Sequence, residues 1–233
     1  MPVSPRELIP LPLRLRLYDL RHRRDPPARR FPGLERVPAG ERRIVLTFDD
    51  GPDEDATPAV LDALDAIGAR ATFFVVGEQV GLAPDLLDEL VRRGHEIGLH
   101  GFRHVRHASF AAGEATDDLR RGVAALEGID PHWYRPPFGR FSDESFRACR
   151  ELGLAPAYWS AWGIDWEPLP AARVAALACR GLADGSVILL HDSSRYASRE
   201  SALATAEALP LIAERATAAG LRFATLGEAA RPR

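Results

Sequence analysis

Lysine is absent from this chain of 233 residues, and all 30 of its basic residues are arginine. This absence excludes any mechanism that runs through a lysine Schiff base. Cysteine is scarce as well: Cys149 and Cys179 are the only two, they have no CxxC spacing, and they lie in segments with helical patterns. We therefore expect buried free thiols and neither a disulfide nor a zinc knuckle.

Long hydrophobic runs are also missing. No stretch approaches the roughly 18 apolar residues that a membrane-spanning helix requires. Arg14 and Arg16 interrupt the apolar stretch from Leu11 to Leu17, so the first 20 residues lack the core of a signal peptide. The sequence therefore predicts no transmembrane segment and a cytoplasmic protein.

Charge is distributed unevenly along the chain. The formal net charge is -3, but residues 1–43 contain 11 arginines and five acidic residues, a sum of +6, which leaves -9 for the rest. A basic leader can make weak contacts with acidic lipid headgroups, and this membrane-surface role stays open. No nucleic-acid-binding module and no stripe of arginines interleaved with aromatics is present, so nucleic acid is not an expected partner.

The composition suits one domain, because 46% of the residues are hydrophobic and the chain is short for two cores. Residues 1–41 hold eight prolines and form an N-terminal extension, and residues 42–233 form the domain proper. Leucines alternate with arginines from Leu13 to Leu17, which would suit an edge strand, a membrane-surface segment or a tail packed on the body. A partly ordered extension is the default expectation.

From Arg43 onward, short apolar runs alternate with helical patterns. The seven expected strands are 44–48, 72–76, 96–99, 133–135, 157–160, 187–190 and 222–225. The six expected helices are 58–68, 84–93, 115–126, 142–152, 171–180 and 202–219. This alternation predicts an α/β fold in which a parallel sheet, open or closed into a barrel, is covered by helices.

Chemically reactive side chains follow the ends of these strands. The motifs are Thr47-Phe48-Asp49-Asp50-Gly51-Pro52, His100-Gly101-Phe102-Arg103-His104, Arg135-Pro136-Pro137-Phe138-Gly139, Asp165-Trp166 and Leu189-Leu190-His191. Active sites of α/β proteins form at the carboxyl ends of parallel strands, so we expect these residues to gather there.

His100 and His104 are four residues apart, so both imidazoles would face the same way on a helical turn. An isolated pair with this spacing is weak evidence, since two surface histidines would show it too. Asp50, from another strand end, could complete a triad of two histidines and one carboxylate that leaves metal positions open. The spacing of His95 and His100 does not fit a zincin helix, so His95 is expected to be structural, and His107 is given no role.

Asp49 and Asp50 are adjacent, and neighbours on an extended chain point to opposite sides. One carboxylate could then bind a metal ion while the other remains free to accept a proton. A turn alone would explain Gly51-Pro52 but would leave the two neighbouring carboxylates without a reason.

These five motifs, in this order, resemble the polysaccharide deacetylases of the NodB-homology type, carbohydrate esterase family 4, from about Arg42 to Gly227. The resemblance implies a distorted (β/α) barrel with seven strands. It also implies metal-dependent hydrolysis of acetyl groups from N-acetylglucosamine polymers such as chitin and peptidoglycan, from related oligomers or glycoconjugates, or from O-acetylated xylan.

The resemblance also implies a role for each motif residue. Asp49 would be the general base, and Asp50, His100 and His104 would hold one divalent metal ion, usually zinc, which acidifies water and polarises the acetyl carbonyl. The other implied roles are Arg135 orienting the base, the backbone of Phe138 stabilising the oxyanion, His191 as general acid paired with Asp165, and Trp166 and Leu189 as walls of the acetyl pocket.

Three positions depart from the family pattern. Gly101 stands where Ser or Thr is common, so a hydrogen bond that steadies the loop is expected to be missing. Trp162 stands where a further Asp is frequent, which suggests a sugar-stacking surface or a narrower acceptor site. Phe138 replaces a usual Tyr, a change that leaves a backbone donor intact.

Other functions remain open at this point. An O-acetyl esterase or a catalytically weak carbohydrate-binding protein would carry the same motifs. A non-haem iron oxygenase also uses two histidines and one carboxylate, but it would leave Asp49, Arg135 and the pair of Asp165 with His191 unexplained.

Overall fold

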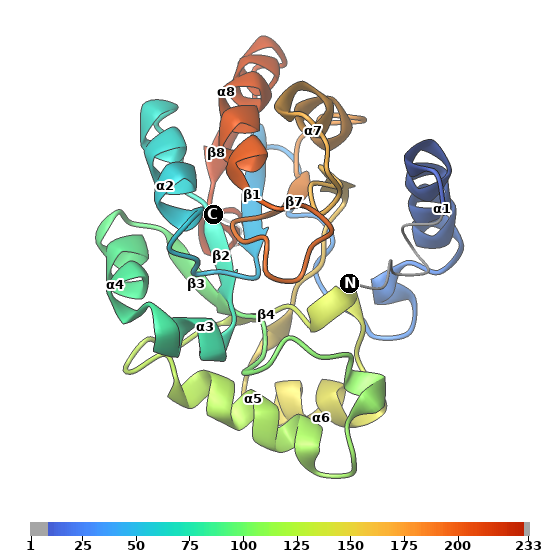
Figure 1. Cartoon of the computed structure of the whole chain (residues 1–233), viewed down its shortest axis with the longest axis vertical. Coiled ribbons are helices and arrows are strands. Elements are labelled where there is room, and N and C mark those ends of the chain that lie inside the picture. The colour runs from blue at the N-terminus through green and yellow to red at the C-terminus, as the bar shows by residue number, and fades with distance from the viewer. Residues whose placement is uncertain (1–8, 231–233) are drawn as a thin grey trace.

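The computed structural model describes residues 9–230 and shows a curled, all-parallel sheet surrounded by helices (Figure 1). The strands follow the order β5-β4-β3-β2-β1-β7-β6, and β8 also pairs with β1. The strands are β1 (Arg43–Asp49), β2 (Thr72–Val75), β3 (Glu96–Leu99), β4 (Trp133–Tyr134), β5 (Ala155–Pro156), β6 (Ala161–Trp162), β7 (Val187–His191) and β8 (Arg222–Ala224). The α/β barrel-like fold expected from the sequence is confirmed.

The α-helices are α1 (Leu11–Arg24), α2 (Thr57–Ala66), α3 (Gly77–Leu82), α4 (Pro84–Arg92), α5 (Glu114–Ala124), α6 (Asp143–Glu151), α7 (Ala171–Ala178), α8 (Leu203–Ala218) and α9 (Leu226–Ala230). Six of them match the helices expected from the sequence to within a few residues, whereas α1, α3 and α9 were not expected. None of the helices in the described range could cross a membrane. Cys149, buried in α6, and Cys179, just after α7, are both free thiols, as expected, but Cys179 is only half-buried.

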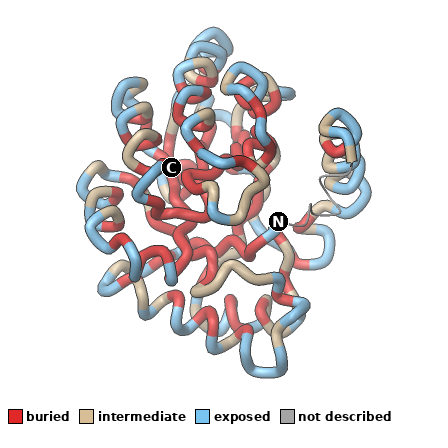
Figure 2. Tube along the Cα trace, viewed as in Figure 1, coloured by how far each residue is buried: buried red, intermediate tan, exposed pale blue. Residues whose placement is uncertain are grey.

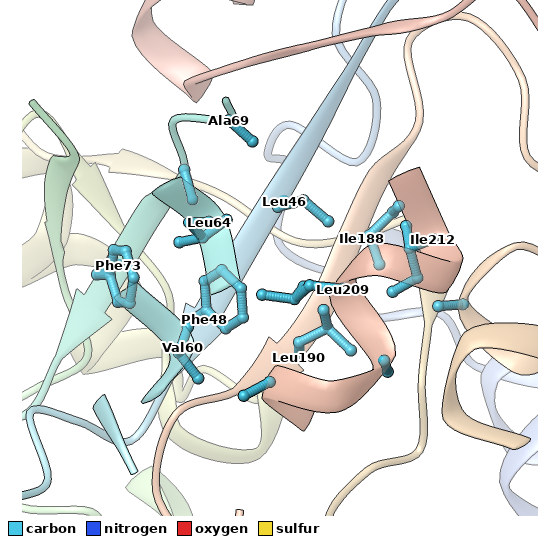
Figure 3. Packing of buried hydrophobic residues seen from close by; sticks show 14 of the residues in the cluster. Leu46, Phe48, Val60, Leu64, Ala69, Phe73, Ile188, Leu190, Leu209 and Ile212 are labelled. Atoms are coloured by element: carbon cyan, nitrogen blue, oxygen red, sulfur yellow. The ribbon is translucent and has the colours of Figure 1, made fainter. Parts of the chain in front are cut away.

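Alternation along the central strands divides the core into two layers. Phe48 of β1 and Leu190 of β7 point outward, into a cluster between the sheet and helices α2 and α8 (Figure 3). The intervening residues face the inside of the curled sheet, where Val45, Val187 and Leu189 meet the aromatic side chains of neighbouring strands. Buried residues accordingly run through the centre of the molecule (Figure 2). Because side chains alternate along a strand, this arrangement also turns Asp49 inward.

The strand expected at 157–160 is wrong. This segment instead crosses the gap between the two edges of the sheet, and the short strands β5 and β6 flank it. The backbone N–H of Tyr158 donates to the carbonyl of Leu34 at 2.7 Å, and Leu34 forms a parallel bridge with Ala157. The N-terminal segment thus supplies backbone partners that a regular strand would have found in the sheet.

The alternating leucines and arginines of the N-terminal extension form helix α1, and the edge-strand interpretation is wrong. Leu11, Leu15 and Tyr18 pack against the outer core cluster. Further along, Tyr158 donates its hydroxyl hydrogen to the carbonyl of Phe31 at 2.8 Å, and Val37 donates to Gly185 at 3.0 Å. The described part of the extension is therefore packed on the body of the protein.

Candidate active site

The sequence-predicted site residues gather at the carboxyl ends of the strands. Asp49 and His191 are register partners at the last position of the β1–β7 pair, and both face inward. A cavity of about 370 Å³ opens over them. Of the ten predicted site residues, eight line this cavity: Asp49, Asp50, His100, His104, Phe138, Trp166, Leu189 and His191. The other two, Arg135 and Asp165, are fully buried behind it.

Asp50 begins a tight turn that directs its carboxylate into the cavity. Its φ of 83° lies in the left-handed region, so Asp49 and Asp50 do not form the extended pair expected from the sequence. The turn is held by Asp192, which accepts hydrogen bonds from the N–H of Gly51 at 3.1 Å and the hydroxyl of Thr57 at 2.7 Å. Both acidic side chains therefore face the same site, and the expectation of opposite directions is wrong.

His100 and His104 converge through an irregular loop, so the helical turn expected between them is also wrong. Gly101 has a φ of 93°, and the next residue, Phe102, donates its N–H to the carboxylate of Asp118 at 2.9 Å. The N–H groups at the start of α3 bond to the carbonyls of the same loop. Asp118 and α3 thus steady the loop, in which Gly101 cannot supply the side-chain hydrogen bond that Ser or Thr would make at that position.

Asp50, His100 and His104 form a compact set of potential metal ligands. One ligand atom from each lies within 4.8 Å of the other two. The Nε2 atom of His104 is 3.2 Å from Asp50 Oδ1, and that of His100 is 3.5 Å from the same oxygen. This oxygen is buried and has no hydrogen-bond partner within the described residues. A buried carboxylate oxygen facing two imidazoles fits a divalent cation.

The protonation states favour the same interpretation. His100 Nδ1 lies 2.7 Å from the carbonyl of Arg135, which can only accept, so Nδ1 carries a proton and Nε2 is the nitrogen that faces Asp50. Burial lowers the pKa of His104 to about 4, so its ring is neutral at pH 7. Burial opposes ionisation of Asp50, but its contact with His100 and the nearby imidazoles hold its pKa below the usual range.

Arg135 holds Asp49 from behind the cavity. Its Nη1 donates to Asp49 Oδ1 at 2.7 Å and to the hydroxyl of Thr47 at 2.8 Å. Nη2 donates to the carbonyl of Tyr158 at 2.7 Å, and the guanidinium carbon lies 4.0 Å from the ring centre of Phe74. A fully buried cation with these fixed acceptors holds the Asp49 carboxylate in one orientation.

His191 and Asp165 form the second charged pair. His191 Nδ1 donates to Asp165 Oδ1 at 2.8 Å, while Asp165 Oδ2 accepts from the hydroxyl of Thr205 at 2.7 Å. Burial acts to lower the pKa of His191, but the charge of Asp165 and its hydrogen bond, with smaller effects of Asp50 and Asp49, raise it to about 9. The imidazole is therefore protonated at pH 7, with Nε2–H as the second donor.

Several residues with a place in the site were missed. Arg199, which is buried, bonds to Thr205 at 2.6 Å and to the carbonyl of His191 at 3.0 Å, and so supports the charged pair. Tyr196 stacks on His104 with ring centres 4.1 Å apart, and Gln79 donates to its hydroxyl at 2.9 Å. Both lie on the loop after β7, where the sequence carries no pattern to reveal them.

The two remaining histidines of this region have structural partners. His95 Nδ1 accepts from the N–H of Ala71 at 3.2 Å, and His107 bonds to the hydroxyls of Ser145 at 2.7 Å and Tyr134 at 3.0 Å. Neither lines the cavity. Trp162 does line it, as the departure at that position suggested.

The family profile described as polysaccharide deacetylase matches residues 36–157, just over half of the chain. The chain therefore belongs to the polysaccharide deacetylase family, a class of carbohydrate-acting hydrolases, and the resemblance read from its motifs is confirmed. Among its relatives is the peptidoglycan-N-acetylglucosamine deacetylase of Bacillus cereus, 34% identical over 197 residues, which are 82% of this chain and 90% of that protein.

Two further relatives differ in length. The peptidoglycan-N-acetylglucosamine deacetylase PgdA of Listeria monocytogenes is 31% identical over 80% of this chain, but only 38% of that protein is covered. The chitooligosaccharide deacetylase of Bradyrhizobium sp. is 32% identical over 66% of this chain and 72% of its own length.

Solved structures share the fold. A peptidoglycan N-acetylglucosamine deacetylase in complex with 4-naphthalen-1-yl-N-oxidanyl-benzamide superposes with a TM-score of 0.78 at 28% identity, covering 84% of this chain and 91% of that one. A family 4 carbohydrate esterase from Streptomyces lividans in complex with acetate gives 0.69 at 28% identity, covering 78% and 92%.

Proposed function

We propose that this protein is a zinc-dependent N-deacetylase of N-acetylated amino sugars of the kind found in chitin and peptidoglycan. The observation that carries the proposal is the position of Asp49, whose carboxylate lies beside the metal ligands without being one of them. Its Oδ1 is bonded to Arg135, and its Oδ2 lies 3.8 Å from His100 Nε2. The names of the relatives in Bacillus, Listeria and Bradyrhizobium support the substrate class.

Asp50, His100 and His104 would hold the ion, because two imidazole nitrogens and one carboxylate oxygen are ligands that suit zinc. Bound there, the ion would supply Lewis acidity that polarises the acyl carbonyl and acidifies water. Because Oδ1 of Asp49 is occupied by Arg135, Oδ2 is the atom that takes the proton as the water oxygen attacks the acyl carbon.

The second half of the reaction needs an acid. As the bond between the acyl carbon and the sugar nitrogen breaks, the Nε2–H of His191 donates its proton to the leaving amine, and acetate and the free amino sugar result. Asp165 keeps His191 charged and holds its ring orientation through Nδ1. Phe138, in a left-handed turn with a φ of 59° at the cavity wall, would place a backbone N–H near the oxyanion.

The walls of the cavity fit an acetyl group. Trp166 lies edge-on to His191 with ring centres 5.5 Å apart, and Leu189 of β7 also lines the cavity. These apolar side chains would receive the acetyl methyl next to the proton donor.

The test is acetate release from N-acetylglucosamine oligomers, peptidoglycan fragments and acetylxylan by zinc-loaded, chelated and Asp49→Asn protein. Release from the amino-sugar substrates that requires zinc and is lost in Asp49→Asn is the expected result. A matched control is Asp55→Asn, since Asp55 is an exposed residue outside the cavity. Release from acetylxylan alone would indicate an O-acetyl esterase, and release that survives chelation would refute the metal mechanism.

A further inference from the structure

Helix α1 forms one wall of the active-site cavity. Arg14, Leu17, Tyr18, Arg21 and His22 of this helix line the same cavity as the proposed metal ligands. In Figure 1 the helix stands at the edge of the barrel, on the same side as α7. A segment far from the motifs in sequence is thus part of the substrate site.

The helix is anchored next to the general-acid pair. Arg14 forms an ion pair with Glu167 at 3.1 Å, and Tyr18 donates its hydroxyl hydrogen to the other oxygen of Glu167 at 2.6 Å. Glu167 is completely buried and lies two residues after Asp165. Removing one partner of a buried ion pair leaves the other charge buried and unpaired, which strongly destabilises the folded protein. This contact therefore favours the position of α1 against the body of the protein.

Surface pairs fix the same helix at further points. Asp19 pairs with Arg180, just beyond α7, at 2.6 Å. Asp25, at the end of the helix, pairs with Arg140 at 2.5 Å, next to the turn that carries Phe138. The two pairs therefore hold the helix next to α7 and next to Arg140, which itself lines the cavity.

Aromatic rings of α1 meet those of the barrel across the cavity. His22 stacks on Trp159 with ring centres 5.9 Å apart and lies 4.7 Å from the ring of Trp162. Tyr18 lies edge-on to Trp166 at 5.5 Å. Burial lowers the pKa of His22, so this ring belongs to the wall as a neutral group. Sugar rings pack their C–H faces on such surfaces.

The size of the cavity limits what it can hold. Ligand pockets usually measure about 300–1,000 Å³, and the cavity of about 370 Å³ is near the lower end of that range. A space of this size accommodates one sugar unit with its acyl group, whereas a polymer bound through its interior needs an open path on both sides of that unit.

We propose that α1 closes one side of the active-site cleft and restricts the enzyme to short saccharides or to the end of a glycan chain. This inference rests on the proposed N-deacetylase function and adds the length of its substrate. The residues that set the limit are Leu17 and His22 of α1, which line the cavity.

The experiment measures kcat/KM for acetate release from N-acetylglucosamine oligomers of one to six units. The zinc-loaded wild-type protein should prefer the short members. The double variant Leu17→Ala/His22→Ala should raise the ratio of the six-unit to the two-unit substrate by at least about 10-fold, the scale on which removed side-chain bulk changes selectivity. The control is Leu20→Ala, since Leu20 is as exposed as Leu17 (44% against 43%) and on the same helix but does not line the cavity.

A second variant keeps the test decisive if the double variant does not fold. Leu17→Trp adds bulk to the cavity and should lower kcat/KM at least about 10-fold on every oligomer, while Leu20→Trp should leave it unchanged. An unchanged ratio of the six-unit to the two-unit substrate in the double variant, together with wild-type kcat/KM in Leu17→Trp, would overturn this inference and leave the proposed function standing. Failure of the wild-type protein to release acetate from any oligomer and from peptidoglycan fragments would overturn both.

Discussion

Replacing Asp165 by Asn should disable His191 as an acid. The variant removes the negative charge that raises the pKa of His191 to about 9, while burial, which lowers the pKa, remains. The side-chain oxygen of the new Asn would accept from the backbone N–H of His191 and from the hydroxyl of Thr205, as Asp165 Oδ2 does. The amide NH2 of Asn would then face Nδ1 of His191 as a donor, which favours the neutral ring. The pKa of His191 should therefore fall below the usual 6.5.

The size of the effect follows from the protonated fraction. At pH 8, a group with a pKa of about 9 is roughly 90% protonated, and one with a pKa below 6.5 is less than roughly 3% protonated. Loss of the acid form alone should thus lower kcat at pH 8 by about 30-fold or more. The charges of Asp50 and Asp49 contribute to the raised pKa of His191, and a bound cation would offset them. In wild-type protein the decline of kcat at alkaline pH should therefore have its midpoint at or below about pH 9.

The assay is the pH profile of acetate release between pH 5 and 10 for zinc-loaded wild type, Asp165→Asn and Thr205→Val. The last variant removes one hydrogen bond to Asp165 but keeps its charge, so its alkaline limb should stay close to that of the wild type. An alkaline limb of Asp165→Asn that coincides with that of wild type would refute the assignment of His191 as the acid.

Stability should change with pH through the same pair. The folded pKa of His191, about 9, exceeds the ordinary value of 6.5, so the pair stabilises the fold fully below pH 6.5, and this is lost as the pH rises through 9. The difference amounts to about 3 kcal/mol at 1.36 kcal/mol per pKa unit. Urea unfolding of chelated protein at pH 6 and pH 10 should show this loss in wild type and not in Asp165→Asn.

Three further changes have defined outcomes. Asp50→Asn should weaken zinc binding at least about 100-fold in a competitive chelator titration, because it removes the charged ligand; unchanged affinity would contradict the proposed triad. Arg135→Met should lower the free energy of unfolding by about 3–5 kcal/mol, because it leaves the buried carboxylate of Asp49 without its partner. Arg30→Met, which breaks the exposed ion pair with Asp143, should lower it by less than about 1 kcal/mol. Equal losses in the two variants would argue against the buried pair. Gly51→Ala should cost about 1–3 kcal/mol in urea unfolding, because a Cβ there would overlap the carboxylate of Asp192, and a wild-type value would exclude that close packing.

Secondary structure was predictable where the pattern is local. Phe48 and Leu190 belong to alternating strands whose outer faces are apolar, and the helices α2 and α8 begin and end within two residues of the predicted bounds. The segment 157–160 was not predictable, because its backbone bonds to Leu34, more than 100 residues away in the chain. A short apolar run predicts a strand whether or not the folded sheet has a neighbouring strand for it to pair with.

The site could be predicted in its parts and only partly in its geometry. Residue types and their order predicted which side chains gather at the cavity. The helical turn predicted at His100 was wrong, since Asp118 and α3 hold that loop in another shape. The turn at Asp50 likewise depends on Asp192, a residue that no short-range pattern connects to it.

The sequence by itself therefore determined the fold class, the family and most of the side chains that line the candidate site, because these depend on local periodicity and on short motifs at strand ends. Only the tertiary structure decided how Asp49 and Asp50 share one cavity, which residues support His191, and that α1 covers the site. These features arise from contacts between segments far apart in the chain, such as Arg14 with Glu167, and their energies depend on burial and distance, which no linear pattern records.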